Sequence, residues 1–174
     1  EVGQINYAFQ YLNFSKNYSG NRHLLRANLK ADKLEFQTHS SVLKTNSDRT
    51  SSNFLRSISQ LKYQVGKFWP GVKFSTENNK IVSQIDSQLD SLSQRFSSYE
   101  GFLGVGDSTK VFVKVGYVHR VNDSVQDNRL QRVNQSDTYY LNSKLIASKN
   151  TDLSLFVNYR LFNLKTQDQS VQKS

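Results

Sequence analysis

The sequence contains no cysteine and no methionine, and only one proline among its 174 residues. Without cysteine, neither a disulfide framework nor a thiolate-bound metal site can form. No stretch approaches the roughly 18–20 consecutive apolar residues of a transmembrane helix. Hydrophobic residues make up 36% of the chain, below the roughly 45–50% of ordinary globular domains, a reference that also counts glycine. The length favours one domain. The start at Glu1–Gly3, without an initiator methionine or a signal peptide, leads us to expect a mature product, a trimmed product or a fragment.

Aromatic and basic residues are abundant by contrast. The chain has 9 Tyr, 11 Phe and 1 Trp, which argues against a disordered polymer. Its formal net charge of +9 suits nucleic acid, an anionic membrane surface or lipopolysaccharide as a partner. The charge alone does not choose among these three.

Apolar and polar residues alternate along most of the chain. In 153–161, for example, every odd position is Leu, Val or Tyr, and Ser154, Asn158 and Arg160 lie between them. A period of two predicts β-strands with one apolar face and one polar face. Similar alternation begins near residues 5, 23, 34, 55, 99, 111 and 139, with a shorter run at 72–77. We therefore expect an all-β fold of about nine long strands.

The connections between these strands alternate between short and long. Short turns are expected at 31–33, 66–71, 106–108 and 148–150. Long polar connections are expected at 13–21, 45–53, 78–97 and 122–136. An up-and-down antiparallel meander would place all the short turns at one end, as transmembrane β-barrels do. Most of the expected strands also approach the roughly 9–11 residues of a membrane-spanning strand.

One segment departs from the period of two. Ile81, Ile85, Leu89, Leu92 and Phe96 are separated by four, four, three and four residues, which is helical spacing. Asn78 or Asn79 could cap the start of this helix. We therefore expect a helical insertion over 79–97.

Two hairpin-like segments resemble bacterial outer-membrane β-barrels. They are Thr138–Leu145 and Leu153–Arg160, joined across the turn at 148–150. The Asn-, Ser- and Lys-rich composition is similar to that of barrels from Bacteroidota. The resemblance covers about residues 3–162, lies at the level of the class, and carries over no functional residue. It implies a barrel or barrel segment over 1–164, a polar tail at 165–174, and a location in the bacterial outer membrane.

The expected strand number adds a further inference about the assembly. Single-chain bacterial barrels have an even number of strands, whereas this chain supplies about nine. We therefore expect part of a larger barrel, completed by other polypeptide segments or subunits. Its remaining partners would be outer-membrane lipid and lipopolysaccharide, and no nucleic acid.

The alternation sorts residues into three predicted sets. The lipid-facing set is Ile5, Tyr7, Phe9, Leu25, Leu29, Leu61, Tyr63, Val113, Val115, Leu145, Leu155 and Val157. The basic set facing the barrel lumen is Arg26, Lys30, Lys62, Lys114, Lys144 and Arg160. The interfacial aromatic set is Trp69, Tyr139, Tyr140 and Tyr159. Barrels carry aromatic girdles at both membrane interfaces and polar residues inside.

Motifs for catalysis or cofactor binding are weak. His23, His39 and His119 lie on separate expected strands without metal-ligand spacing, so no metal is assigned. The glycines in 101–106 end a strand and are followed by another strand, whereas a phosphate-binding loop needs a helix there. No cofactor is expected.

Three carboxylates near the expected helix, Asp86, Asp90 and Glu100, are a weak candidate for acid–base chemistry. Catalytic carboxylate pairs need environments that separate their pKa values, and a solvated surface does not supply them. The sequence therefore favours a non-enzymatic component with a structural, transport or translocation role.

One alternative remains open. Ser40, Ser57, Ser59 and Ser143 fall on the apolar side of the alternation, where unpaired hydroxyls would be costly in lipid. They favour a soluble basic β-sandwich or open barrel that binds carbohydrate, lipid or another anionic polymer. A nucleic-acid-binding sheet rests on the net charge alone and is the weakest interpretation.

Overall fold

The computed structural model describes residues 2–15, 18–48, 50–83, 92–107, 111–126, 129–148 and 151–164. Within these ranges the chain forms nine β-strands and no helix. The strands are β1 (Val2–Ser15), β2 (Tyr18–Ala31), β3 (Leu34–Ser47), β4 (Thr50–Tyr63), β5 (Phe68–Ser83), β6 (Leu92–Asp107), β7 (Val111–Gln126), β8 (Arg129–Ser148) and β9 (Thr151–Leu164). The all-β prediction is confirmed.

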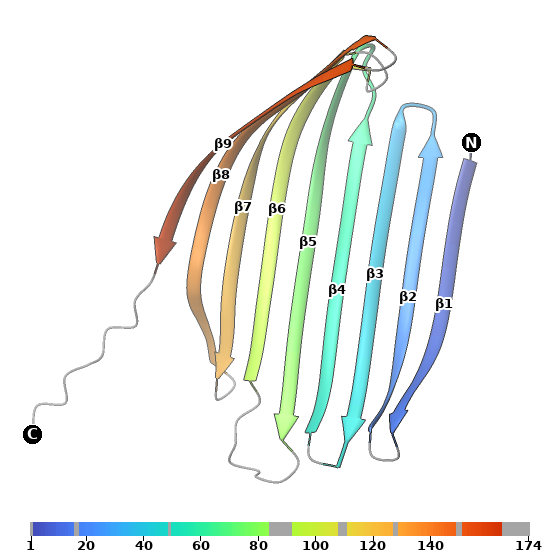
Figure 1. Ribbon diagram of the computed structural model, residues 1–174, viewed down its shortest axis with the longest axis vertical. Helices are drawn as coiled ribbons and strands as arrows, with labels where there is room; N and C mark the ends of the chain where they lie inside the picture. The colour runs from blue at the N-terminus through green and yellow to red at the C-terminus, as the bar shows by residue number, and fades with distance from the viewer. Residues whose placement is uncertain are drawn as a thin grey trace, which may run out of the picture.

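The strands form one antiparallel sheet in sequence order. Each strand pairs only with its neighbours in the chain, from β1 at one edge to β9 at the other (Figure 1). This arrangement confirms the up-and-down meander. Among the described residues β1 makes no contact with β9, so the sheet is open and is not closed into a barrel.

The helical insertion predicted over 79–97 is wrong wherever the structure describes it. Ile81 lies in β5 and pairs with Leu92 at the start of β6, while Phe96 pairs with Glu77. Ile85 and Leu89 lie outside the described residues. The described members of this series belong to two paired strands, whose backbone groups bond across the sheet instead of within a helix. No helix in the described ranges is long and apolar enough to cross a membrane.

The long polar connections are also mostly strand. Residues 78–83 and 92–97 extend β5 and β6, and 122–126 and 129–136 extend β7 and β8. The strands are consequently 14–20 residues long, which exceeds the lengths expected from the alternation. A strand continues through polar residues as long as its backbone remains hydrogen-bonded to both neighbouring strands. Side-chain polarity therefore predicted the loop boundaries poorly.

The short turns follow the prediction more closely. Residues Asp32 and Lys33 join β2 to β3, and Asp32 adopts a positive φ of 49°. The turn expected at 66–71 is displaced, since Phe68 already begins β5 and Pro70 lies within that strand. The turns expected at 106–108 and 148–150 fall partly on residues outside the described ranges, between paired strands β6–β7 and β8–β9.

The cross-strand register divides the side chains between two faces. On the first, which we call the apolar face, Leu29 pairs with Phe36, Phe36 with Leu61, and Leu61 with Val72. On the second, the polar face, Lys30 pairs with Glu35 and Glu35 with Lys62. Directly paired residues share a face, so the register places the whole predicted lipid-facing set on the apolar face and the whole basic set on the polar face.

The sheet is a single layer within the described residues. Among the described residues, only Phe102 and Val121 are buried hydrophobic residues, and no large side chain is fully buried. Large apolar side chains instead remain exposed on the apolar face, with Ile5 at 66% and Leu155 at 53% exposure. The sheet is curved (Figure 1), and polar-face residues from β4 through β9 line one shared cavity. The polar face is therefore the concave one.

Candidate functional site

Tyrosines follow one row across the apolar face. Tyr117 pairs with Tyr139, which pairs with Tyr159, and the rings of the first two lie 5.1 Å apart. On the apolar face, between this row and the short turns, the exposed residues of β7 and β9 are Val and Leu. Tyr63 and Phe68 lie at the short-turn end of the same face. Aromatic rings thus lie at both ends of an aliphatic zone.

The hydroxyls on the apolar face of β3 and β4 satisfy one another. Thr38 Oγ1 lies 2.9 Å from Ser59 Oγ, and Ser40 Oγ lies 2.7 Å from Ser57 Oγ. A paired hydroxyl avoids most of the cost of leaving water. For Ser40, Ser57 and Ser59, these cross-strand pairs remove the argument from the sequence against an apolar environment on this face.

A polar cluster lies just beyond the tyrosine row, on the side away from the short turns. Asp137 accepts a hydrogen bond from the Tyr117 hydroxyl at 2.6 Å and lies 2.7 Å from His119 Nδ1. His119 and Asp137 are directly paired across β7 and β8. No group of three or more potential metal ligands occurs among the described residues. This cluster marks the boundary of the aliphatic zone.

The structure divides the four predicted interfacial aromatics between the two faces. Tyr139 and Tyr159 lie in the tyrosine row of the apolar face. Trp69 and Tyr140 lie on the polar face, where the Trp69 ring covers Gly104 and the Tyr140 ring covers Gly116. A Cβ at either glycine would collide with the ring above it. These two glycines therefore leave the space that the Trp69 and Tyr140 rings occupy on the concave face.

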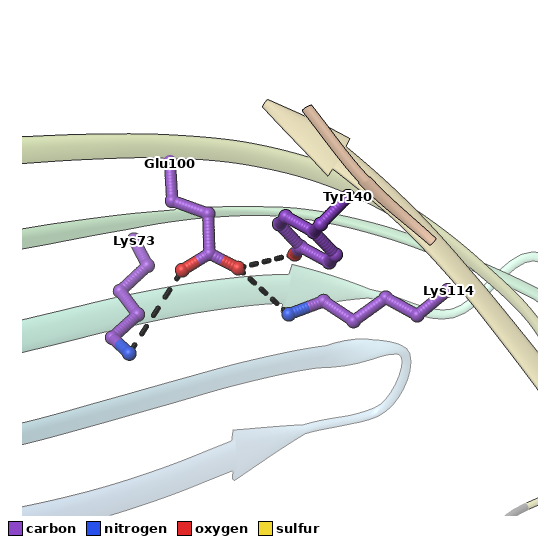
Figure 2. Close-up of polar contacts among 4 residues, drawn as sticks. All are labelled: Lys73, Glu100, Lys114 and Tyr140. Carbon is purple, nitrogen blue, oxygen red and sulfur yellow. Dashed lines mark hydrogen bonds and ion pairs between the residues drawn. The ribbon is translucent and has the colours of Figure 1, made fainter. Parts of the chain in front are cut away.

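Glu100 lies at the centre of a charged cluster on the polar face (Figure 2). Its Oε1 accepts hydrogen bonds from Lys114 Nζ at 2.7 Å and from the Tyr140 hydroxyl, and Oε2 lies 3.8 Å from Lys73 Nζ. The Glu100 side chain is only 12% exposed. Lys114 Nζ also lies 4.0 Å from the centre of the Phe102 ring, within the range of a cation–π contact. The cluster links side chains from β5, β6, β7 and β8 on the concave face.

Basic side chains outnumber acidic ones on the polar face. Lys62 pairs with Glu35 at 2.8 Å, and Arg56 lies 4.0 Å from Glu77. The described basic residues on this face are Arg22, Arg26, Lys30, Arg56, Lys62, Lys73, Lys114, Arg120, Lys144 and Arg160. The described carboxylates on it are Glu35, Glu77 and Glu100. The concave face consequently carries an excess of positive charge.

A cavity of about 540 Å³ opens on this face, and we call it the concave pocket. Arg56 from β4, Lys114 and Arg120 from β7 and Arg160 from β9 line it, with Glu77 as its one carboxylate among the described residues. Of the predicted basic set only Lys114 and Arg160 reach it. Lys30 and Lys62 line a second cavity near the short turns.

The predicted lumen-facing set omits Arg56, which the alternation placed among the basic polar-face residues, and also omits Arg120 and Glu100. Arg56 and Arg120 obey the same alternation as the selected residues, which was the signal that could have found them. Glu100 was noted only as a carboxylate beside an expected helix. Its pairing with Lys114 and Tyr140 depends on the register of β6, β7 and β8, which no local pattern encodes.

Comparison of the chain with protein-family models, with curated proteins and with solved structures found no significant match.

Proposed function

We propose that this chain forms a section of a bacterial outer-membrane β-barrel with a structural, transport or translocation role and no catalytic activity. The apolar face meets lipid, and the concave polar face lines the barrel interior. The observation that carries the proposal is an exposed apolar face on a single-layer sheet. Soluble monomers seldom expose apolar patches larger than a few hundred Å².

The dimensions of the sheet support this proposal. Strands of 14–20 residues are far longer than the roughly 5–6 residues common in soluble proteins. The apolar face of β9 runs from Leu153 to Leu161, and eight steps of about 3.4 Å span roughly 27 Å along the strand, or about 20 Å of height at the roughly 40° tilt of barrel strands. The apolar band of outer-membrane barrels is about 25 Å tall. In a soluble sandwich this face would instead lie against a second sheet.

The open edges indicate how the barrel is completed. Backbone groups at an unpaired edge cannot lie in lipid, so β1 and β9 must each meet a further strand there. Nine consecutive antiparallel strands make β1 and β9 run in the same direction. An all-antiparallel closure therefore needs an odd number of additional strands, from the same polypeptide or from another subunit. Together they would give the even total typical of bacterial barrels.

Dilution of the urea-unfolded chain into buffer, into zwitterionic detergent and into liposomes tests the proposal. We expect soluble β-structure, measured by circular dichroism, only with detergent or lipid, because the apolar face aggregates in water. Once reconstituted with the strands that pair with β1 and β9, the chain should also float with liposomes on a density gradient after a carbonate wash, because an open edge cannot lie in lipid. A monodisperse β-sheet protein in plain buffer that does not float would contradict the proposal and favour a soluble basic β-module.

A further inference from the structure

We propose that the concave pocket is a binding site for a small multivalent oxyanion, such as a solute that carries phosphate or carboxylate groups. The pocket brings Arg56, Arg120 and Arg160 from β4, β7 and β9 to one cavity of about 540 Å³. Arginine is suited to this chemistry because its planar guanidinium donates paired hydrogen bonds to phosphate and carboxylate oxygens.

The charge of two of these arginines is not neutralised within the described part of the chain. The ion pairs found there include neither Arg120 nor Arg160. The Arg120 guanidinium lies 5.5 Å from the centre of the Phe96 ring, and Arg160 Nε donates to Thr138 Oγ1 at 3.2 Å. Both contacts orient a guanidinium without cancelling its charge. Lys114, by contrast, is already paired with Glu100.

The register places these two arginines where one ligand can reach both. Arg120 pairs with Ser136 and Arg160 pairs with Thr138, so the two arginines flank β8 and are offset by two residues along it. Two strand spacings separate the backbones of β7 and β9 by roughly 10 Å. Two arginine side chains are long enough to reach an anion that lies between them.

The rest of the lining can hold the other oxygens of such a ligand. Hydroxyls of Ser75, Ser98, Ser136 and Thr138 and amides of Asn142 and Asn158 lie around the same cavity. These groups donate hydrogen bonds without adding negative charge. The single carboxylate, Glu77, lies on the side of Arg56. A neutral or cationic solute would leave the two arginine charges unmatched. The inference concerns the concave face alone and does not require that the apolar face meets lipid.

Calorimetric titration of the folded chain with pyrophosphate tests the site, in detergent or in buffer according to its solubility. We expect wild-type chain to bind, and the double variant Arg120→Gln, Arg160→Gln to bind about 100-fold more weakly, since each charged hydrogen-bonding partner contributes on the order of tenfold. Citrate should compete for the site if any multivalent oxyanion fits, and should fail to compete if phosphate is required. Glucose should not bind in either case.

A matched control separates the pocket from the general charge of the face. Arg22→Gln, Arg26→Gln removes the same charge from β2 on the same face, outside the concave pocket. This variant should bind pyrophosphate within about twofold of wild type, with circular dichroism confirming that both variants fold. Equal weakening in the two double variants, or no binding by wild type at millimolar pyrophosphate, would overturn the inference.

Discussion

Leu155→Arg should lower the stability of the membrane-inserted chain by about 2–4 kcal/mol, the cost of a lipid-facing arginine near the centre of the bilayer. Leu155 lies on the apolar face of β9, between Leu153 and Val157, and its side chain is 53% exposed. In the proposed orientation this exposed surface contacts hydrocarbon. Urea unfolding of the completed barrel in liposomes, followed by circular dichroism, measures the loss.

The neighbouring position supplies the control. Ser154 pairs with Lys144 and therefore lies on the polar face of the same strand. Ser154→Arg adds the same side chain where water is available, so its cost should stay below about 1 kcal/mol. If the two arginine variants unfold at the same urea concentration, the apolar face does not meet lipid.

Glu100→Gln should destabilise the chain by about 2–3 kcal/mol, somewhat less than the roughly 3–5 kcal/mol for breaking a fully buried ion pair. The substitution keeps the shape of the side chain but leaves Lys114 and Lys73 facing each other without a carboxylate between them. The Lys114 side chain is 22% exposed, so solvent reduces the penalty in part. Urea unfolding of the variant in detergent measures the effect.

Salt dependence and a second variant identify the cause. Repulsion between the two lysines should weaken as ionic strength rises, so salt should restore part of the lost stability of Glu100→Gln. Glu77→Gln removes a carboxylate whose partner Arg56 lies 4.0 Å away in an exposed pair, and it should cost at most about 0.5 kcal/mol. Similar losses in both variants would show that the Glu100 cluster has no special role in stability.

The sheet, its sequence order and its two faces could be predicted from the sequence because a period of two is a local signal. Leu153, Leu155 and Val157 had to share a face in any regular strand. The ends of the strands could not be predicted in the same way. Strand pairing continues past the apolar zone into Asn- and Ser-rich segments, and the partner strand, rather than side-chain polarity, determines where it stops.

The composition of the polar face was predicted only in part. Alternation placed Lys114 and Arg160 there and implies the same for Tyr140, but Trp69 lay in a segment expected to be a turn and actually belongs to β5. Gly104 and Gly116 leave room for the two rings to lie over the neighbouring strands. The concave pocket depends on the curvature of the whole sheet, which brings β4 and β9 to one cavity. No single segment of the sequence predicts this long-range geometry.

Site-specific labelling along β9 tests most directly whether the apolar face meets lipid. The chain has no cysteine, so single substitutions such as Leu155→Cys, Ser154→Cys, Val157→Cys and Asn158→Cys each introduce one site for an environment-sensitive fluorophore. In liposomes we predict that labels at 155 and 157 are quenched by nitroxide-bearing lipids, whereas those at 154 and 158 are not. Equal quenching at odd and even positions, or quenching of all four by aqueous iodide alone, would contradict the proposed orientation.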